Sequence, residues 1–137
     1  MLETLRAALT PNVESVRRAP EGWERASEYP YAHHSEAAAA AEHHRDTGSH
    51  ERAEALLEWC LDFAEAEARA EYFVDVPPAH YEALADLYRD AGRDASAVAV
   101  LERYVEFVGG IGGTPRARMV ERLEAARERA GQDGDGQ

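Results

Sequence analysis

Two stretches of the chain repeat the same spacing over eight positions. Residues 37–60 and residues 81–104 carry matching offsets, with a glycine at the fifth position in each, Gly48 and Gly92. The aligned positions are Ala37, Ala40, Ala41, His44, Gly48, Ala53, Leu57 and Cys60 against Tyr81, Leu84, Ala85, Tyr88, Gly92, Ala97, Leu101 and Tyr104. Offsets of three, four and seven residues follow one face of a helix. A glycine between two such faces permits a tight reversal of the chain, so the pattern predicts two helical hairpins.

Four alanines stand where the helices of each predicted hairpin would cross. Ala41 and Ala53 lie on either side of the first glycine, and Ala85 and Ala97 lie on either side of the second. A small side chain on each helix lets the two axes come close. We therefore expect these four methyl groups to be buried.

Start and stop signals predict helices along the rest of the chain as well. Ser49 and Asp94 are good N-cap residues, and Thr114 followed by Pro115 marks the start of a last helix. No segment alternates apolar and polar residues in the manner of a strand. The expected helices cover residues 34–45, 49–72, 78–92, 94–108 and 114–130. The predicted fold is all-α, a short stack of antiparallel helical hairpins with a C-terminal capping helix.

The length of 137 residues suits one domain, which we place at residues 1–131. Its hairpins are expected at 34–62 and 78–108 and its capping helix at 114–130. Residues 132–137 offer no apolar side chain, and a disordered tail is predicted there.

The first third of the chain is divided by prolines, and how residues 1–33 pack is left open by the sequence. Short helical pieces are expected near Leu2–Leu9, Asn12–Ala19 and Glu21–Tyr29. The large apolar residues Trp23, Tyr29 and Tyr31 are expected to anchor this region onto the hairpins. Burial against the same region is also expected for Tyr72, Phe73 and Val74.

The charge balance is strongly acidic. The chain has 27 Asp and Glu against 15 basic residues, all of them arginine, for a formal net charge of −12. A field of this sign repels phosphate backbones and anionic lipid, so we expect neither nucleic acid nor a membrane as partner. The composition resembles that of proteins from salt-accumulating, halophilic organisms or from organisms with very GC-rich genomes, and in the first case acidity serves solubility. Whether the acidity here serves solubility or binding stays open.

Cysteine usage and hydropathy point to an intracellular chain. The single cysteine, Cys60, allows no internal disulfide and is expected to be a buried apolar residue. No apolar run approaches the roughly 20 residues that a membrane-spanning helix needs, and no signal peptide is evident. We expect a cytoplasmic protein.

The repeated hairpin resembles the tetratricopeptide repeat, which pairs two antiparallel helices in a unit of about 34 residues. The two units here begin 44 residues apart, and the excess lies around residues 65–78. The proline that closes each family unit is absent, and Val108–Gly113 offers glycines in its place. The resemblance covers roughly residues 34–130 and implies an interaction module whose first helices line a groove. By position, that groove would present Glu42, Arg45, Glu82, Asp86 and Arg89.

The resemblance implies a non-catalytic adaptor that binds another protein or peptide. The lysine and asparagine pattern with which some relatives clamp a terminal carboxylate is missing. A segment carrying basic residues is therefore the expected ligand. The equally open alternative is that these five residues form only a solvated face.

The histidines raise a metal hypothesis, but their spacing argues against it. His33 and His43 would lie about 15 Å apart on one helix, and adjacent helical histidines point about 100° apart. There is no Glu-x-x-His pair and no His-Glu-x-x-His motif. We expect surface histidines, no bound metal and no cofactor.

Two weaker motifs remain. Arg45 and His50, with four residues between them, resemble the catalytic motif of the HEPN family of helical ribonucleases, a spacing that chance also explains. The run Gly109–Gly113 is expected to be a flexible connection rather than an anion cradle.

No catalytic set is therefore predicted, and the leading hypothesis is a protein-interaction module. A HEPN-like ribonuclease or metal-binding helical protein and a structural subunit that dimerises are the alternatives. The partner, the pathway and the oligomeric state are not determined by the sequence.

Overall fold

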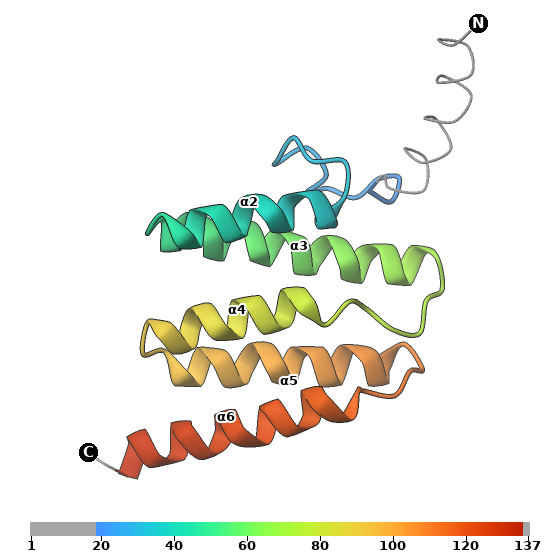
Figure 1. Ribbon diagram of the computed structural model, residues 1–137. Coiled ribbons are helices and arrows are strands. Elements are labelled where there is room, and N and C mark those ends of the chain that lie inside the picture. The colour runs from blue at the N-terminus through green and yellow to red at the C-terminus, as the bar shows by residue number, and fades with distance from the viewer. Residues whose placement is uncertain (1–18, 136–137) are drawn as a thin grey trace, which may run out of the picture.

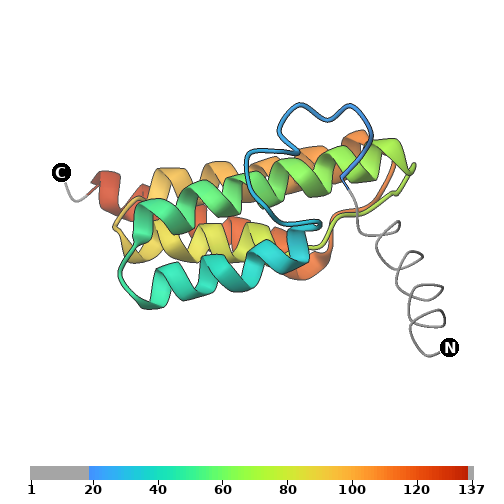
Figure 2. The same ribbon diagram turned by 90° about the horizontal axis from the view of Figure 1, so that it is seen from above.

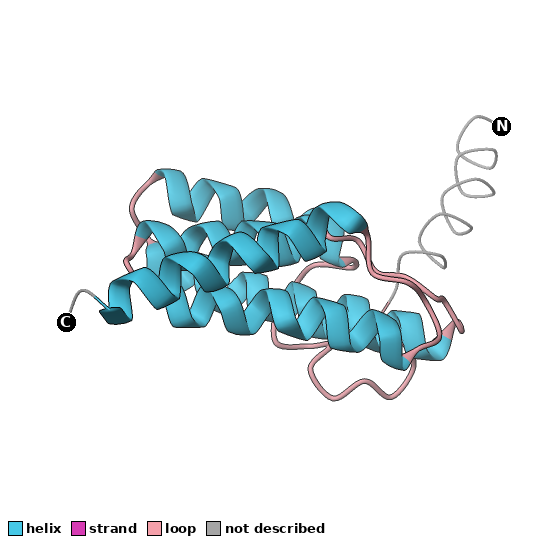
Figure 3. Cartoon of the chain, turned by 90° about the horizontal axis from the view of Figure 1, so that it is seen from below, coloured by secondary structure: helices cyan, strands magenta, loops and turns pink. Residues whose placement is uncertain are grey.

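The computed structural model describes residues 19–135, with backbone alone for residues 132–135. This part of the chain contains five helices and no strand, which confirms the all-α prediction (Figures 1 and 3). The helices are α2 (His34–Asp46), α3 (His50–Ala70), α4 (Ala79–Asp90), α5 (Asp94–Gly110) and α6 (Ala117–Asp135). None of these helices is both long and apolar enough to cross a membrane.

The helices are stacked in chain order, each packing on the next (Figure 1). The view from above shows α2 and α4 on one side of the stack and α3 and α5 on the other (Figure 2). The first helices of the two hairpins are therefore neighbours, and so are the second helices.

Both hairpins use the crossing that the repeat predicts. Ala41, Ala53, Ala85 and Ala97 are each at most 3% exposed, which confirms their burial. They belong to one continuous apolar core that also holds Trp59, Phe63, Tyr81 and Tyr104.

The two corners are also equivalent. Gly48 and Gly92 have φ of +83° and +74°, a conformation that suits glycine because it carries no Cβ. After each glycine, the next amide donates back across the corner, from Ser49 N to His44 O at 2.7 Å and from Arg93 N to Tyr88 O at 2.8 Å. The two bonds lie at the same positions of the repeat.

The N-terminal aromatic residues anchor as expected, but without a helix. Trp23 lies 5.7 Å from Trp59 and 5.2 Å from Phe63 between ring centroids, and Tyr29 and Tyr31 also contact Trp59. The helical prediction for residues 21–29 is wrong, because this segment folds as a series of turns. Trp59 Nε1 donates to the carbonyl of Arg25 at 2.8 Å, which holds those turns on α3. The pieces predicted at 2–9 and 12–18 lie outside the described residues.

The last helix is shifted relative to its prediction. It begins at Ala117, two residues after Pro115: the carbonyl of Arg116 accepts the first helical bond from Val120 N at 3.1 Å, and the N–H of Arg116 donates to Tyr104 Oη at 3.2 Å. It continues to Asp135, so the backbone of residues 132–135 is helical where a disordered tail was predicted.

The segment after α3 corrects another expectation. Tyr72 is 90% exposed, and Phe73 and Val74 are about half exposed. The N-terminal aromatic residues pack on Trp59 and Phe63, well before the end of α3, so they do not reach this segment. Tyr72 has a φ of +57°, in the left-handed region that residues other than glycine seldom adopt.

Candidate functional site

A hollow of about 450 Å³ opens between α2 and α4, with one side chain from α6 at its edge. Its apolar lining comes from small residues and one leucine, and its charged lining from three carboxylates and two guanidinium groups. The lining residues are Ala38, Ala41, Glu42, Arg45, Leu57, Ala79, His80, Glu82, Ala83, Asp86 and Arg122. Four of the five residues that the repeat assigned to a groove, all but Arg89, therefore meet at one surface.

The carboxylates of α4 are already paired. Glu82 contacts Arg118 at 2.9 Å and Arg122 at 3.3 Å, and Asp86 contacts Arg122 at 2.5 Å. Both arginines come from α6, and one of them, Arg122, also lines the hollow. Sequence reasoning missed this role. The signal was available, since Arg118 and Arg122 are spaced i, i+4 beside the buried stripe of α6 and oppose the charge of α4.

The remaining predicted residues differ in their surroundings. Arg45 pairs with Asp90 at 2.5 Å and so links the two hairpins across the hollow. Glu42 is exposed, with no ion pair among the described residues. Arg89 is also exposed and lies outside the lining of the hollow.

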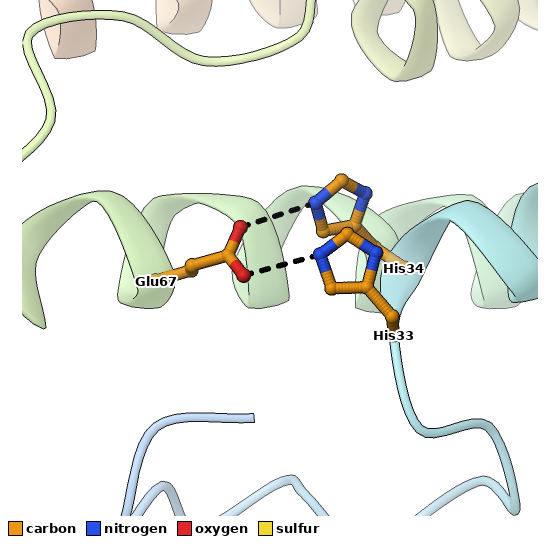
Figure 4. A group of neighbouring side chains, drawn as sticks. All are labelled: His33, His34 and Glu67. Atoms are coloured by element: carbon orange, nitrogen blue, oxygen red, sulfur yellow. Dashed lines mark hydrogen bonds and ion pairs between the residues drawn. The ribbon is translucent and has the colours of Figure 1, made fainter. Parts of the chain in front are cut away.

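A second cluster lies at the other end of the first hairpin. His33 Nε2 is 3.1 Å from Glu67 Oε2, and His34 Nε2 is 3.4 Å from Glu67 Oε1 (Figure 4). His33 is the N-cap of α2, His34 is its first residue, and Glu67 lies in the last turn of α3. The antiparallel hairpin brings these two helix ends together.

The cluster extends inward through a buried pair of rings. His34 Nδ1 lies 2.7 Å from His80 Nε2, and the two residues are only 4% and 5% exposed. Phe63 packs against the rings of His33 and His34 with centroids 5.3 and 5.4 Å away. His80 also lines the hollow, so it belongs to both features.

The protonation preferences follow from burial and contacts. Burial lowers the pKa of His80 to about 4, with help from the positive charge of the neighbouring histidines. Burial alone would raise the pKa of Glu67, but hydrogen bonds and attraction from His34 and His33 outweigh it and lower that pKa. At neutral pH the cluster therefore holds an ionised carboxylate beside a neutral His80.

The prediction that the histidines lie on the surface is wrong for this group. It treated His33 and His34 as successive residues of a helix, whose rings would diverge. His33 is instead extended, with φ of −149° and ψ of 152°, so both rings face the same carboxylate and their centroids lie 3.8 Å apart. His43 and His50 are exposed, in agreement with the expectation.

The other candidate residues are placed as follows. Arg45 lies near the end of α2 and His50 begins α3, with the corner at Gly48 between them. Cys60 is fully buried, and burial raises the pKa of its thiol to about 12, so the thiol stays protonated, as a structural cysteine does. α5 continues through Gly109 and Gly110, so the flexible connection expected there is shorter than predicted.

One buried charge was not anticipated from the sequence. Glu65 is 7% exposed, accepts from Tyr81 Oη at 2.8 Å and pairs with Arg103 at 2.8 Å. Arg103 also contacts Asp62, which in turn pairs with Arg25. Every member of this network is partnered, which indicates a structural role in holding α3, α4 and α5 together.

Comparisons of the chain with protein-family models, with curated proteins and with solved structures find no match.

Proposed function

We propose that the chain is a tetratricopeptide-like interaction module that binds a segment of another protein in the hollow between α2 and α4. The observation that carries this proposal is the convergence of Glu42, Arg45, Glu82 and Asp86 around a hollow lined by alanines. A recess with small apolar side chains and a charged rim is a common form of peptide-binding groove.

The lining indicates the chemistry of the segment. Ala38, Ala41 and Ala83 leave space that an apolar side chain of the partner fills, and burial of that side chain supplies affinity. Glu82 and Asp86 are held by arginines of α6, so they shape the rim more than they attract cations. Glu42 is the carboxylate that selects a basic side chain beside the apolar anchor.

The arrangement of the helices in the stack also supports the tetratricopeptide-like assignment. The family places the first helices of successive units side by side along a groove, and α2 and α4 are such neighbours (Figure 2). The ten residues beyond the family period of about 34 correspond to the long helix α3 and the connector 71–78. The inserted stretch, residues 65–78, does not line the hollow.

The proposal is tested by selecting short peptides from a displayed library against the full-length protein. We expect enrichment of peptides with an apolar residue next to lysine or arginine. Ala38→Trp, which fills the hollow, should weaken binding of the selected peptide at least tenfold. Ala39→Trp is the matched control, because Ala39 is the next residue of α2 and is exposed outside the hollow, and it should bind like the wild type.

Two outcomes would contradict the proposal. One is equal loss of binding in both tryptophan variants. The other is a combination of two results: no peptide is selected, and the mass measured by size-exclusion chromatography in molar salt rises with protein concentration. That combination would favour a structural subunit that dimerises, with the exposed residues 72–74 as its contact.

A further inference from the structure

We propose that His33, His34 and Glu67 form a binding site for a divalent transition metal ion of the zinc type. The site is separate from the peptide-binding role and does not depend on it. Its three side chains come from the two ends of one hairpin, and their ligand atoms all lie within 4.8 Å of one another.

The spacing of the ligand atoms fits one ion. Zinc binds imidazole nitrogen and carboxylate oxygen at about 2.0–2.2 Å, which places tetrahedral ligand atoms about 3.3–3.5 Å apart. His33 Nε2 lies 3.1 Å from Glu67 Oε2 and His34 Nε2 lies 3.4 Å from Glu67 Oε1, so each imidazole is about one ligand-to-ligand spacing from a carboxylate oxygen. Both imidazoles face the carboxylate of Glu67 (Figure 4), so an ion held between them would replace the two direct contacts.

The surroundings favour a metal-binding tautomer for His34 and permit one for His33. A histidine that binds metal through Nε2 carries its proton on Nδ1 and needs an acceptor for it. For His34 that acceptor is His80 Nε2 at 2.7 Å, and for His33 it is Ser35 Oγ at 2.9 Å. The weaker contact from Ser35 N to His33 Nδ1, at 3.3 Å, is given up in this tautomer.

The same contacts limit the freedom of the rings. Phe63 packs edge-on against both imidazoles and fills the space beneath them. His34 is nearly fully buried, and the side chains of His33 and Glu67 are each 15% exposed. The ligands are therefore pre-arranged, while the open side leaves a fourth position for water, as in zinc sites with three protein ligands.

The ligand set selects the class of metal. Two imidazoles and one carboxylate suit zinc and its neighbours among the transition metals, whereas calcium and magnesium prefer sets made entirely of oxygen. The strongly negative net charge of the chain raises the local concentration of cations.

The test is calorimetric titration of untagged, full-length protein with zinc chloride at neutral pH. We expect one ion per chain at micromolar or tighter affinity. His33→Gln and Glu67→Gln should each weaken it at least tenfold. His43→Gln, which removes an exposed histidine of the same helix, should leave it unchanged.

No uptake by the wild type would overturn the proposal. Uptake that His43→Gln removes, or that survives both His33→Gln and Glu67→Gln, would overturn it as well. Cobalt substitution of the wild type tests the site without any variant that might unfold: a tetrahedral visible spectrum supports it, and a weak octahedral spectrum contradicts it.

Discussion

The two hairpins share a frame, made of buried alanines and a glycine corner, and differ in the side chains that pack inside it. At equivalent positions, α2 pairs with α3 and α4 pairs with α5 through buried alanines, and both corners turn at a glycine of positive φ. In the second hairpin, Tyr81 and Tyr104 pack edge to face with centroids 5.3 Å apart. In the first, the same positions hold Ala37 and Cys60, which are small.

The open end of each hairpin, opposite its glycine corner and here called the mouth, differs even more between the two. His33 and His34 of the first correspond to Pro77 and Pro78 of the second, 44 residues later. Glu67 corresponds to Ile111, which is partly buried against the apolar core. His33, His34 and Glu67 therefore have no polar counterparts in the second hairpin, where the same positions hold prolines and an aliphatic residue.

The comparison shows that the buried alanines and the glycine corner specify each hairpin. The residues at the mouth are free to differ between the two hairpins. The alanines and glycines are needed for close packing and reversal, so they recur. The residues at the mouth add no such constraint, and one copy there carries three ligand-type side chains. Substitutions at matched positions test this division of roles.

The largest difference is expected at the positions of Cys60 and Tyr104. Tyr104 is fully buried, so Tyr104→Ala should lower the free energy of unfolding by about 3–5 kcal/mol. Cys60→Ala removes one buried sulfur atom and should cost about 1 kcal/mol. Urea denaturation followed by circular dichroism measures both. Similar losses at the two positions would show that the two hairpins are filled alike.

The crossings should respond equally. Ala53→Leu and Ala97→Leu each place a branched side chain at a fully buried position of a second helix, and each should cost about 1–3 kcal/mol through overpacking. Ala39→Leu, on the exposed face of α2, is the control and should be close to neutral. If either crossing accepts leucine as readily as position 39 does, the alanines are not needed for close approach.

The smallest matched effect is expected at the corners. A Cβ at Gly48 or Gly92 meets no atom within 4 Å, so only the backbone conformation opposes substitution. Gly48→Ala and Gly92→Ala should each cost about 1–2 kcal/mol. Gly131→Ala, inside α6, should stabilise by a few tenths to about 1 kcal/mol instead. Thermal unfolding would contradict the account if all three shifts had the same sign.

The frame was predictable because its signals are local in the sequence. Helical periodicity around Gly48 and Gly92 is enough to predict two hairpins and the burial of their alanines. The groove residues Glu42, Arg45, Glu82 and Asp86 then follow from position along the first helices, and the structure places them at one hollow. Their role as a binding surface stays a prediction.

The histidine cluster was not predictable by the same reasoning. The rule that adjacent helical residues diverge fails at His33, because an N-cap residue has extended backbone. Glu67 reaches His33 and His34 because α3 continues well beyond the buried alanine of the crossing. Helical periodicity does not determine where α3 ends. Likewise, the pairing of Arg118 and Arg122 with α4 depends on where α6 lies against the stack.

The most direct test of the two-hairpin account is nuclear magnetic resonance of the alanine methyl groups with a soluble paramagnetic probe. Ala39 and Ala55 are exposed and serve as internal references. The account predicts that the methyl signals of Ala41, Ala53, Ala85 and Ala97 are broadened far less than those of the references. Broadening of these four signals to the same extent as the references would contradict it.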